Sequence, residues 1–255
     1  MSKQISVIGL GYIGLPTSVL LASKKYKIKA SDINEEVVQL INEGKVHISE
    51  PGLDHLLKEA ISRGFLEAYR QIQKSDIYII CVPTPFNKST EIPSPDLSHI
   101  ENVTAELSLI LKPGDLVILE STSPVGTTEM IGNQLKENGV NIEEISIAYC
   151  PERVIPGNIM EELVGNDRIV GGLNLDSTKK ASDFYRSFVN GNVIETDSKT
   201  AELCKLTENS FRDVNIAFAN ELSMICENYE IDTRELIEIA NLHPRVNILD
   251  PGIGV

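Results

Sequence analysis

The glycine-rich stretch Gly-Leu-Gly-Tyr-Ile-Gly at 9–14 constrains the fold of this chain more than any other feature. A short β-branched run at 3–8 predicts a buried strand immediately before it. An apolar run of helical length follows at 15–22, and a second strand is expected at 27–31, just before Asp32. Strand, glycine turn, helix, strand and acid in this order are typical of a dinucleotide-binding unit.

Each conspicuous residue of this unit has a physical reason to be there. Gly9 permits the tight turn, Gly11 lets the backbone approach a pyrophosphate, and Gly14 lets helix and strand pack closely. Free N–H groups and the positive end of the helix dipole suit phosphate oxygens. Asp32 follows at the distance where a carboxylate accepts hydrogen bonds from a ribose diol. The residues expected to contact the dinucleotide at this turn are Gly9, Gly11, Tyr12, Ile13, Gly14 and Asp32.

The acid also predicts which dinucleotide is bound. Asp32 would repel a 2′-phosphate, and no arginine follows it, so NAD is favoured over NADP. A glycine-bearing turn in an unrelated α/β protein is the alternative reading of the motif alone. The agreement of both strands, the helix and the acid favours the dinucleotide site.

Polar loops follow two further buried strands. Continuous apolar runs at 77–82 and 116–120 predict parallel strands, because such strands are covered on both faces. Ligands of doubly wound sheets bind beyond the carboxyl ends of strands, so both following loops should face the cofactor. A proline-stiffened loop without any contact is the alternative for the first. The residues expected to face the cofactor here are Val82, Pro83, Thr84, Ser121 and Thr122.

Charge and cysteine content exclude several functions. A net charge of −14 makes the chain a poor candidate for binding nucleic acid. No apolar run reaches the length of about 18 residues needed for a membrane span, and no signal peptide precedes the first strand. The four cysteines are scattered, with neither a CxxC pair nor any other metal-ligand spacing. We therefore expect free thiols in a reducing cytoplasm and no metal site.

The character of the chain changes near residue 197. The stretch 197–229 holds neither glycine nor proline and predicts one long helix, which would join two domains or form a dimer interface. A shorter helix is expected at 233–242. The predicted fold is α/β: a doubly wound Rossmann-type sheet over 1–196, then a long helix and the start of an all-helical central domain over 197–255. Because this helix would otherwise expose apolar surface, we expect a homodimer.

Several motifs, in the same order, resemble the UDP-glucose/GDP-mannose dehydrogenase family, and most closely its UDP-N-acetyl-D-mannosamine dehydrogenase branch. PERVIPG and HPRVNI in particular resemble the acetamido-sugar enzymes. The matching stretches are GLGYIGLP (9–16), CVPTP (81–85), ESTSPVGTT (120–128), YCPERVIPG (149–157), ELCKLTENSFRDVNIAFANEL (202–222) and ANLHPRVNILDPGIGV (240–255).

The resemblance implies oxidation of C6 of a UDP-N-acetylhexosamine from alcohol to carboxylate with two NAD per turnover, for surface polysaccharide. Lys205 and Asn209 match the residues that hold the C6 oxygen, and their spacing of four puts them on one helix face. Thr122 matches a threonine that positions the catalytic water. Glu152 matches a glutamate implicated in hydrolysis of the thioester. By themselves, Lys205 could be a solvated surface lysine and Glu152 a surface salt-bridge partner.

The remaining family positions lie on the substrate side. The resemblance places Arg153, His243, Arg245 and Asn247 near the sugar nucleotide. Without the resemblance Arg245 would be a solvated charge, and His243, beside Pro244, is better explained by a structural role than by catalysis.

Two departures from the family pattern limit the mechanism. Some relatives carry a second glutamate where this chain has Pro156. The family nucleophile is a cysteine after a PGxGVGG segment, and this sequence reaches only Val255. No cysteine here has that context, and the family's C-terminal UDP-binding domain would also lie further on. We therefore expect this truncated chain to fold, bind NAD and pair, but to turn over weakly or not at all.

Two other readings remain open from the sequence alone. A relative of the β-hydroxyacid dehydrogenases would also combine a dinucleotide fold with a long helix carrying Lys-xxx-Asn, and it would need no cysteine. A catalytically inactive NAD-binding protein is the other. A single oxidation to a ketone would favour the first, and NAD binding without turnover would favour the second.

Overall fold

The computed structural model describes residues 3–87 and 93–254, and the chain divides into two compact units, residues 1–203 and 204–255. The first is an α/β unit built on an eight-stranded sheet, and the second consists of helices and a C-terminal segment.

The sheet of the first unit has the strand order of a dinucleotide-binding fold. Neighbouring strands are parallel except β8 and β9, which run antiparallel. The order of strands reverses between β1 and β4, and this switch point is where doubly wound folds bind their ligands. In spatial order the strands are β3 (Leu66–Tyr69), β2 (Lys27–Ser31), β1 (Gln4–Ile8), β4 (Ile77–Ile80), β7 (Leu116–Leu119), β8 (Ser146–Tyr149), β9 (Arg168–Gly172) and β10 (Val193–Asp197).

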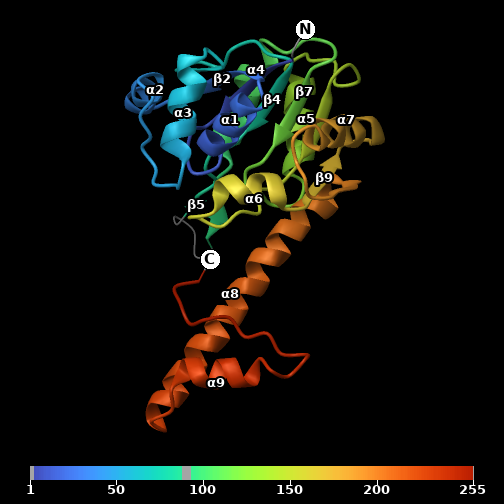
Figure 1. Ribbon diagram of the computed structural model, residues 1–255. Coiled ribbons are helices and arrows are strands. Elements are labelled where there is room, and N and C mark those ends of the chain that lie inside the picture. Colours follow the sequence, from blue (N-terminus) through green and yellow to red (C-terminus); the bar gives the residue numbers. More distant parts are fainter. Residues whose placement is uncertain (1–2, 88–92, 255) are drawn as a thin grey trace. The chain divides into compact units, whose positions relative to one another are not determined.

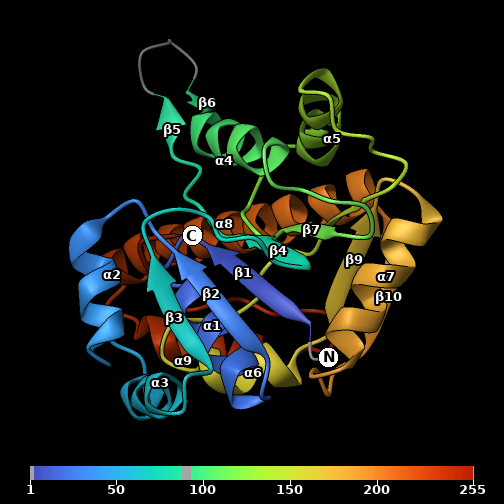
Figure 2. The ribbon, with the colours of Figure 1, turned by 90° about the horizontal axis from the view of Figure 1, so that it is seen from above.

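Helices cover both faces of this sheet. Figure 2 shows α4 and α5 on one side and α1, α3 and α6 on the other. The two central strands Ile77–Ile80 and Leu116–Leu119 are apolar because both of their faces are covered, and they are buried throughout. The helices are α1 (Gly14–Ser23), α2 (Glu35–Asn42), α3 (Leu53–Ser62), α4 (Ser98–Ser108), α5 (Thr127–Glu137), α6 (Ile159–Gly165) and α7 (Leu175–Arg186).

The predicted nucleotide-binding unit is confirmed as a structure. Strand β1, helix α1 and strand β2 occupy the ranges that the hydrophobic pattern predicts, and β1 pairs in parallel with β2. A short antiparallel pair, β5 (Phe86–Asn87) and β6 (Ser94–Pro95), follows β4. The sequence did not predict α6, α7, β9 or β10 individually.

The long helix is confirmed as α8 (Ser198–Asn228), one helix of 31 residues, and a shorter α9 (Thr233–Ala240) follows (Figure 1).

In the second unit three asparagines hold the C-terminal segment by hydrogen bonds. Asn215 and Asn220 of α8 pair with the backbone of 247–252, each donating one hydrogen bond and accepting another. Asn241 pairs in the same way with both backbone groups of Ile248. The side-chain amides thus satisfy backbone N–H and C=O groups of this segment, as a paired strand would.

Candidate functional site

The glycine turn is packed so closely that only glycine fits at two of its positions. Gly9 has φ = +90°, and a Cβ there would lie 2.6 Å from the carbonyl oxygen of Cys81. A Cβ on Gly14 would lie 1.8 Å from the carbonyl oxygen of Gly9. The turn is therefore pressed against the carboxyl end of β4, at the switch point of the sheet.

Gly11 differs from its two neighbours. A Cβ at Gly11 would meet no protein atom within 4 Å, so the fold itself does not require glycine there. No side chain caps the N-terminus of α1, and its first turn contains no acidic residue. Open space, exposed backbone and an uncapped helix N-terminus fit the pyrophosphate of a dinucleotide.

Asp32 shapes the same turn. Its Oδ2 accepts a hydrogen bond from the Leu10 N–H at 2.8 Å, and its Oδ1 accepts one from the Asn34 N–H at 2.8 Å. A carboxylate has about four acceptor positions, so two remain for a ribose diol. The side chain next to it, Ile33, is strongly exposed and offers an apolar surface beside the expected ribose position.

The structure joins the two polar loops that follow β4 and β7. The Ser121 hydroxyl donates to the carbonyl oxygen of Val82 at 2.7 Å, and the Thr84 hydroxyl donates to that of Thr122 at 2.7 Å. Four of the predicted cofactor-side residues thus lie together beside the switch point. Their roles toward NAD remain predictions.

Glu152 occupies a buried ion pair. Its Oε2 accepts from Arg168 Nη1 at 2.8 Å, its Oε1 accepts from the Arg153 N–H at 2.6 Å, and both charged side chains are almost fully buried. The alternative in which Glu152 forms a salt bridge at the surface is therefore wrong, because its salt bridge is buried. The Arg153 guanidinium donates a hydrogen bond to the carbonyl oxygen of Asp167 at 3.1 Å.

A second buried carboxylate lies beside this pair. Glu120 accepts a hydrogen bond from the Tyr185 hydroxyl at 2.7 Å, and its other oxygen lies 3.4 Å from Cys81 Sγ. Burial raises the pKa of Glu120, with Glu152 adding to the shift and Arg168 opposing it. Burial likewise raises the pKa values of the Cys81 thiol and the Tyr185 hydroxyl. Although burial disfavours its charge, Arg168 has a raised pKa because Glu152 faces it.

Glu202, on the first turn of α8, holds the loop after β7. Its carboxylate accepts from the Gly126 N–H at 2.6 Å, the Thr128 N–H at 2.8 Å and the Thr128 hydroxyl at 2.6 Å. It is fully buried and places a negative charge at the N-terminus of α5, where the helix dipole favours it. Four residues of these buried contacts were not predicted from the sequence: Glu202, Arg168, Glu120 and Tyr185. For Glu120 there was a signal: it ends an otherwise apolar run.

The remaining predicted residues lie in the second unit. Lys205 and Asn209 are one turn apart on α8, both half-buried. His243 Nδ1 accepts a hydrogen bond from the Arg245 N–H at 3.3 Å, which fits a structural role for the histidine. The backbone oxygen of Asn247 accepts from Asn215 at 2.9 Å. Their roles toward a substrate remain predictions.

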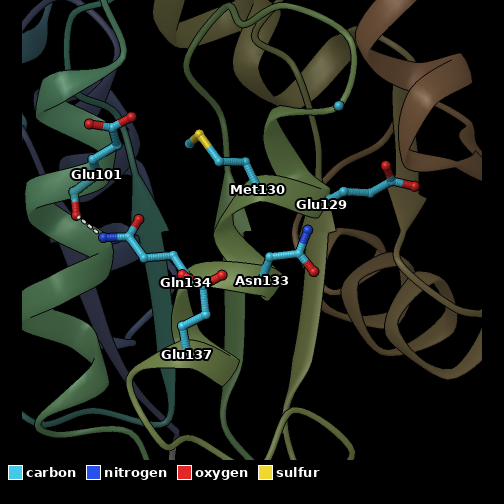
Figure 3. A pocket seen from close by; sticks show the side chains of 7 residues that line it. Glu101, Glu129, Met130, Asn133, Gln134 and Glu137 are labelled. Atoms are coloured by element: carbon cyan, nitrogen blue, oxygen red, sulfur yellow. Dashed lines mark hydrogen bonds between the residues drawn. The ribbon is translucent and has the colours of Figure 1, made fainter.

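An open pocket of about 440 Å³ between α4 and α5 is a poor candidate for this site (Figure 3). Three glutamates line it, and Gln134 donates to the Glu101 carbonyl oxygen across it at 2.9 Å. Its acidic lining would repel a nucleotide phosphate. The lining residues are Glu101, Gly126, Glu129, Met130, Asn133, Gln134 and Glu137.

Residues 3–87 and 93–254 contain neither a metal-binding cluster nor a membrane-spanning helix. No cluster of three or more His, Cys, Asp or Glu side chains is arranged to hold a metal ion. No helix in this part of the chain has the length and hydropathy to cross a bilayer. The four cysteines are free thiols.

The fold and the glycine turn define a dinucleotide-binding domain of the dehydrogenase type. Residues 3–189 match the NAD binding domain of the UDP-glucose/GDP-mannose dehydrogenase family, and residues 199–255 match its central domain. The chain therefore belongs to this family, and the cofactor of its first domain is NAD. The match over both regions favours this family over the β-hydroxyacid dehydrogenases.

Individual relatives agree with the family. A Yersinia pestis protein named UDP-N-acetyl-D-mannosamine dehydrogenase is 51% identical over 99% of this chain and 62% of its own length. A Ralstonia nicotianae protein named NDP-N-acetyl-D-galactosaminuronic acid dehydrogenase is 50% identical, over 99% of this chain and 61% of its own. The solved UDP-D-ManNAc dehydrogenase of Pyrococcus horikoshii has a TM-score of 0.91 at 45% identity, over 99% and 60% of the two chains. This chain thus spans about three fifths of these relatives.

Proposed function

We propose that this chain supplies the NAD-binding domain and part of the active site of a UDP-N-acetyl-D-mannosamine 6-dehydrogenase. The observation that carries the proposal is identity of about 50% over nearly the whole chain to relatives that act on acetamido-sugar nucleotides by name. The reaction would convert the C6 alcohol to a carboxylate in the cytoplasm, and its product would feed surface polysaccharide.

The proposed chemistry assigns roles to few side chains. NAD would supply the oxidising capacity, one molecule for each of the two hydrides that the oxidation of C6 to a carboxylate releases. Lys205 and Asn209 can both donate hydrogen bonds, and their common helix face lets them hold one oxygen as it gains negative charge. Thr122 would orient a water, and hydrogen bonds of the Ser121 and Thr84 hydroxyls hold the loop that carries it. Glu152 would act in the hydrolytic half of the reaction.

One pair of glycine variants tests the cofactor part. Gly11→Ala should abolish NAD binding and leave the melting temperature almost unchanged, because the new methyl meets no protein atom. Gly165→Ala is the matched control, since its Cβ would also meet nothing within 4 Å and it lies at the end of α6. Equal NAD affinity of both variants by calorimetry would contradict a pyrophosphate site at the turn.

The substrate part is tested by following NADH absorbance. The purified chain is mixed with NAD and UDP-N-acetyl-D-mannosamine, with UDP-glucose and the gluco and galacto acetamido sugars in parallel. NADH from the manno sugar alone would support the proposal, and these 255 residues would then suffice for the first oxidation. NADH from UDP-glucose alone would overturn it. NAD binding without turnover on any of the sugars would favour the inactive reading of this chain.

We also propose that two copies pair through α8. Four of its exposed apolar residues form one stripe at helical spacing: Phe211, Val214, Phe218 and Ile225, each at least half exposed. Phe218→Glu should shift the chain from dimer to monomer in sedimentation velocity. Met224→Glu is the control, because Met224 is as exposed but lies about 120° around the helix from Phe218. A monomeric wild type would refute the proposal.

A further inference from the structure

A buried layer of ionisable side chains lies at the carboxyl edge of the sheet in the first unit. Cys81 and Glu120 each come directly after the last residue of a parallel strand, β4 and β7, and these strands are paired neighbours. Glu152 follows β8 by three residues. Because β9 runs antiparallel to β8, its first residue, Arg168, lies at this same edge. Tyr185, near the end of α7, completes the layer.

The two carboxyl groups of this layer have different hydrogen-bond partners. Glu152 takes the direct ion pair with Arg168 at 2.8 Å and a backbone N–H at 2.6 Å. Glu120 has only neutral partners, the Tyr185 hydroxyl at 2.7 Å and Cys81 Sγ at 3.4 Å. The Arg168 guanidinium also lies over the Tyr185 ring, 5.5 Å from its centroid.

The charge balance of the layer then decides the state of Glu120. One guanidinium faces two carboxyl groups away from water, and a second uncompensated carboxylate there would be costly. The group that lacks the ion pair is the one that keeps its proton. The pKa of Glu120 is raised, in agreement with this assignment, because burial outweighs the lowering effects of Arg168 and of the hydrogen bonds from Tyr185 and Cys81. The ionisable groups that face Glu120 are Cys81, Cys150, Glu152, Arg168 and Tyr185.

We propose that Glu120 is a positioning residue that stays protonated at neutral pH. Because it is then neutral, it does not compete for Arg168, which forms its ion pair with Glu152 alone. In this state Oε1 of Glu120 accepts from the Tyr185 hydroxyl, and Oε2, which accepts from the Cys81 thiol, carries the proton. The Glu152 carboxylate is then held as an anion in one orientation by Arg168. The importance of that anion for the reaction rests on the proposed function, whereas the protonation of Glu120 does not.

Infrared spectroscopy of the 255-residue chain tests the proton directly. The difference spectrum of wild type minus Glu120→Gln at pH 7 should contain the carbonyl stretch of one protonated carboxyl group, shifted in D₂O. Glutamine matches the shape of a protonated glutamic acid, so this variant should fold. Asp115→Asn, another buried acid away from this layer, is the control and should leave the Glu120 signal in place. Absence of the signal from the wild-type difference spectrum would overturn the proposal.

A second set of variants tests the link to Glu152. Arg168→Met removes the cation, so a new protonated carboxyl signal should appear and should be lost again in Arg168→Met/Glu152→Gln. Arg168→Lys restores a charge and should remove the new signal, which a purely structural role of the arginine would not predict. Arg168→Met without the new signal would overturn the link. If Arg168→Met does not fold, Glu120→Gln still decides the protonation.

The infrared result and the proposed function can fail separately. A wild-type chain that does not bind NAD would count against the proposed function and would leave the Glu120 signal intact. A missing Glu120 signal in a chain that binds NAD would count against the positioning role alone.

Discussion

Removing the buried cation Arg168 should destabilise the first unit strongly. Its side chain is 2% exposed and that of Glu152 is 7% exposed, with 2.8 Å between Nη1 and Oε2. Truncating one partner of such a pair leaves the other as an uncompensated buried charge or forces it to take up a proton, at a cost of about 3–5 kcal/mol. Arg168 also donates to the Leu163 carbonyl oxygen at 3.1 Å, and Arg168→Met orphans this acceptor too. We therefore expect Arg168→Met to lose at least about 3 kcal/mol.

The same substitution at an exposed pair provides the control. Arg70 and Glu35 lie 3.3 Å apart, but their side chains are 58% and 65% exposed. Solvent and salt screen such pairs, so Arg70→Met should cost less than about 1 kcal/mol. The two variants delete the same guanidinium and differ mainly in burial.

Urea unfolding at pH 7 measures both losses. The chain has no tryptophan, so the transition is followed by far-UV circular dichroism. In the double variant Arg168→Met/Glu152→Gln the uncompensated charge is gone, so its loss should be clearly smaller than the sum of the two single losses. If Arg168→Met falls within about 1 kcal/mol of Arg70→Met, or if the losses add, the buried ion pair does not have the role assigned to it.

Three further predictions follow from single carboxyl and amide groups. Because the folded pKa of Glu120 is raised, the stability it contributes is present below its ordinary pKa and is lost as pH rises through the raised value. The free energy of unfolding of wild type should thus fall relative to Glu120→Gln by up to about 1.4 kcal/mol per pH unit, and parallel pH profiles in urea titrations would refute this. Glu202→Gln should cost about 1.5–3 kcal/mol in the same assay, since an amide cannot accept from all three donors of Gly126 and Thr128; a loss near zero would show that the charge is unimportant. Asn220→Ala should accelerate hydrogen exchange of the Gly252 amide, which donates to Asn220 at 2.9 Å, and unchanged exchange would mean that the segment is held elsewhere.

The sequence predicts the nucleotide-binding unit well because its signals are local. Gly9, Gly11 and Gly14 lie within six residues of one another, and the strand before them ends on the apolar pair Val7-Ile8. The structure adds a distinction that the motif does not contain. Gly9 and Gly14 are required by the fold, whereas the space at Gly11 is left open for a ligand.

The buried ion pair could not be predicted in the same way. Glu152 and Arg168 meet because β9 turns back antiparallel beside β8, and no local pattern fixes the direction of that strand. The dipeptide Gly171-Gly172 was the available hint. A Cβ on Gly171 would lie 2.2 Å from the Asp197 carbonyl oxygen, and one on Gly172 would lie 2.3 Å from the Thr178 N–H nitrogen, so both glycines report close backbone packing around β9.

The sheet topology explains why charged groups are tolerated beneath this edge. Parallel strands end together, so side chains that are distant in sequence are brought to one edge without any local preference of their own. Cys81 links the glycine turn to the buried layer of ionisable side chains. Its backbone packs against the turn, since a Cβ on Gly9 would touch its carbonyl oxygen, and its thiol contacts Glu120. The fold thus connects the dinucleotide turn to the Glu152 anion through the partly buried Cys81 and the buried side chains of the layer. A proton on Glu120 keeps the net charge of this connection at zero, and that neutrality is what allows it to remain buried.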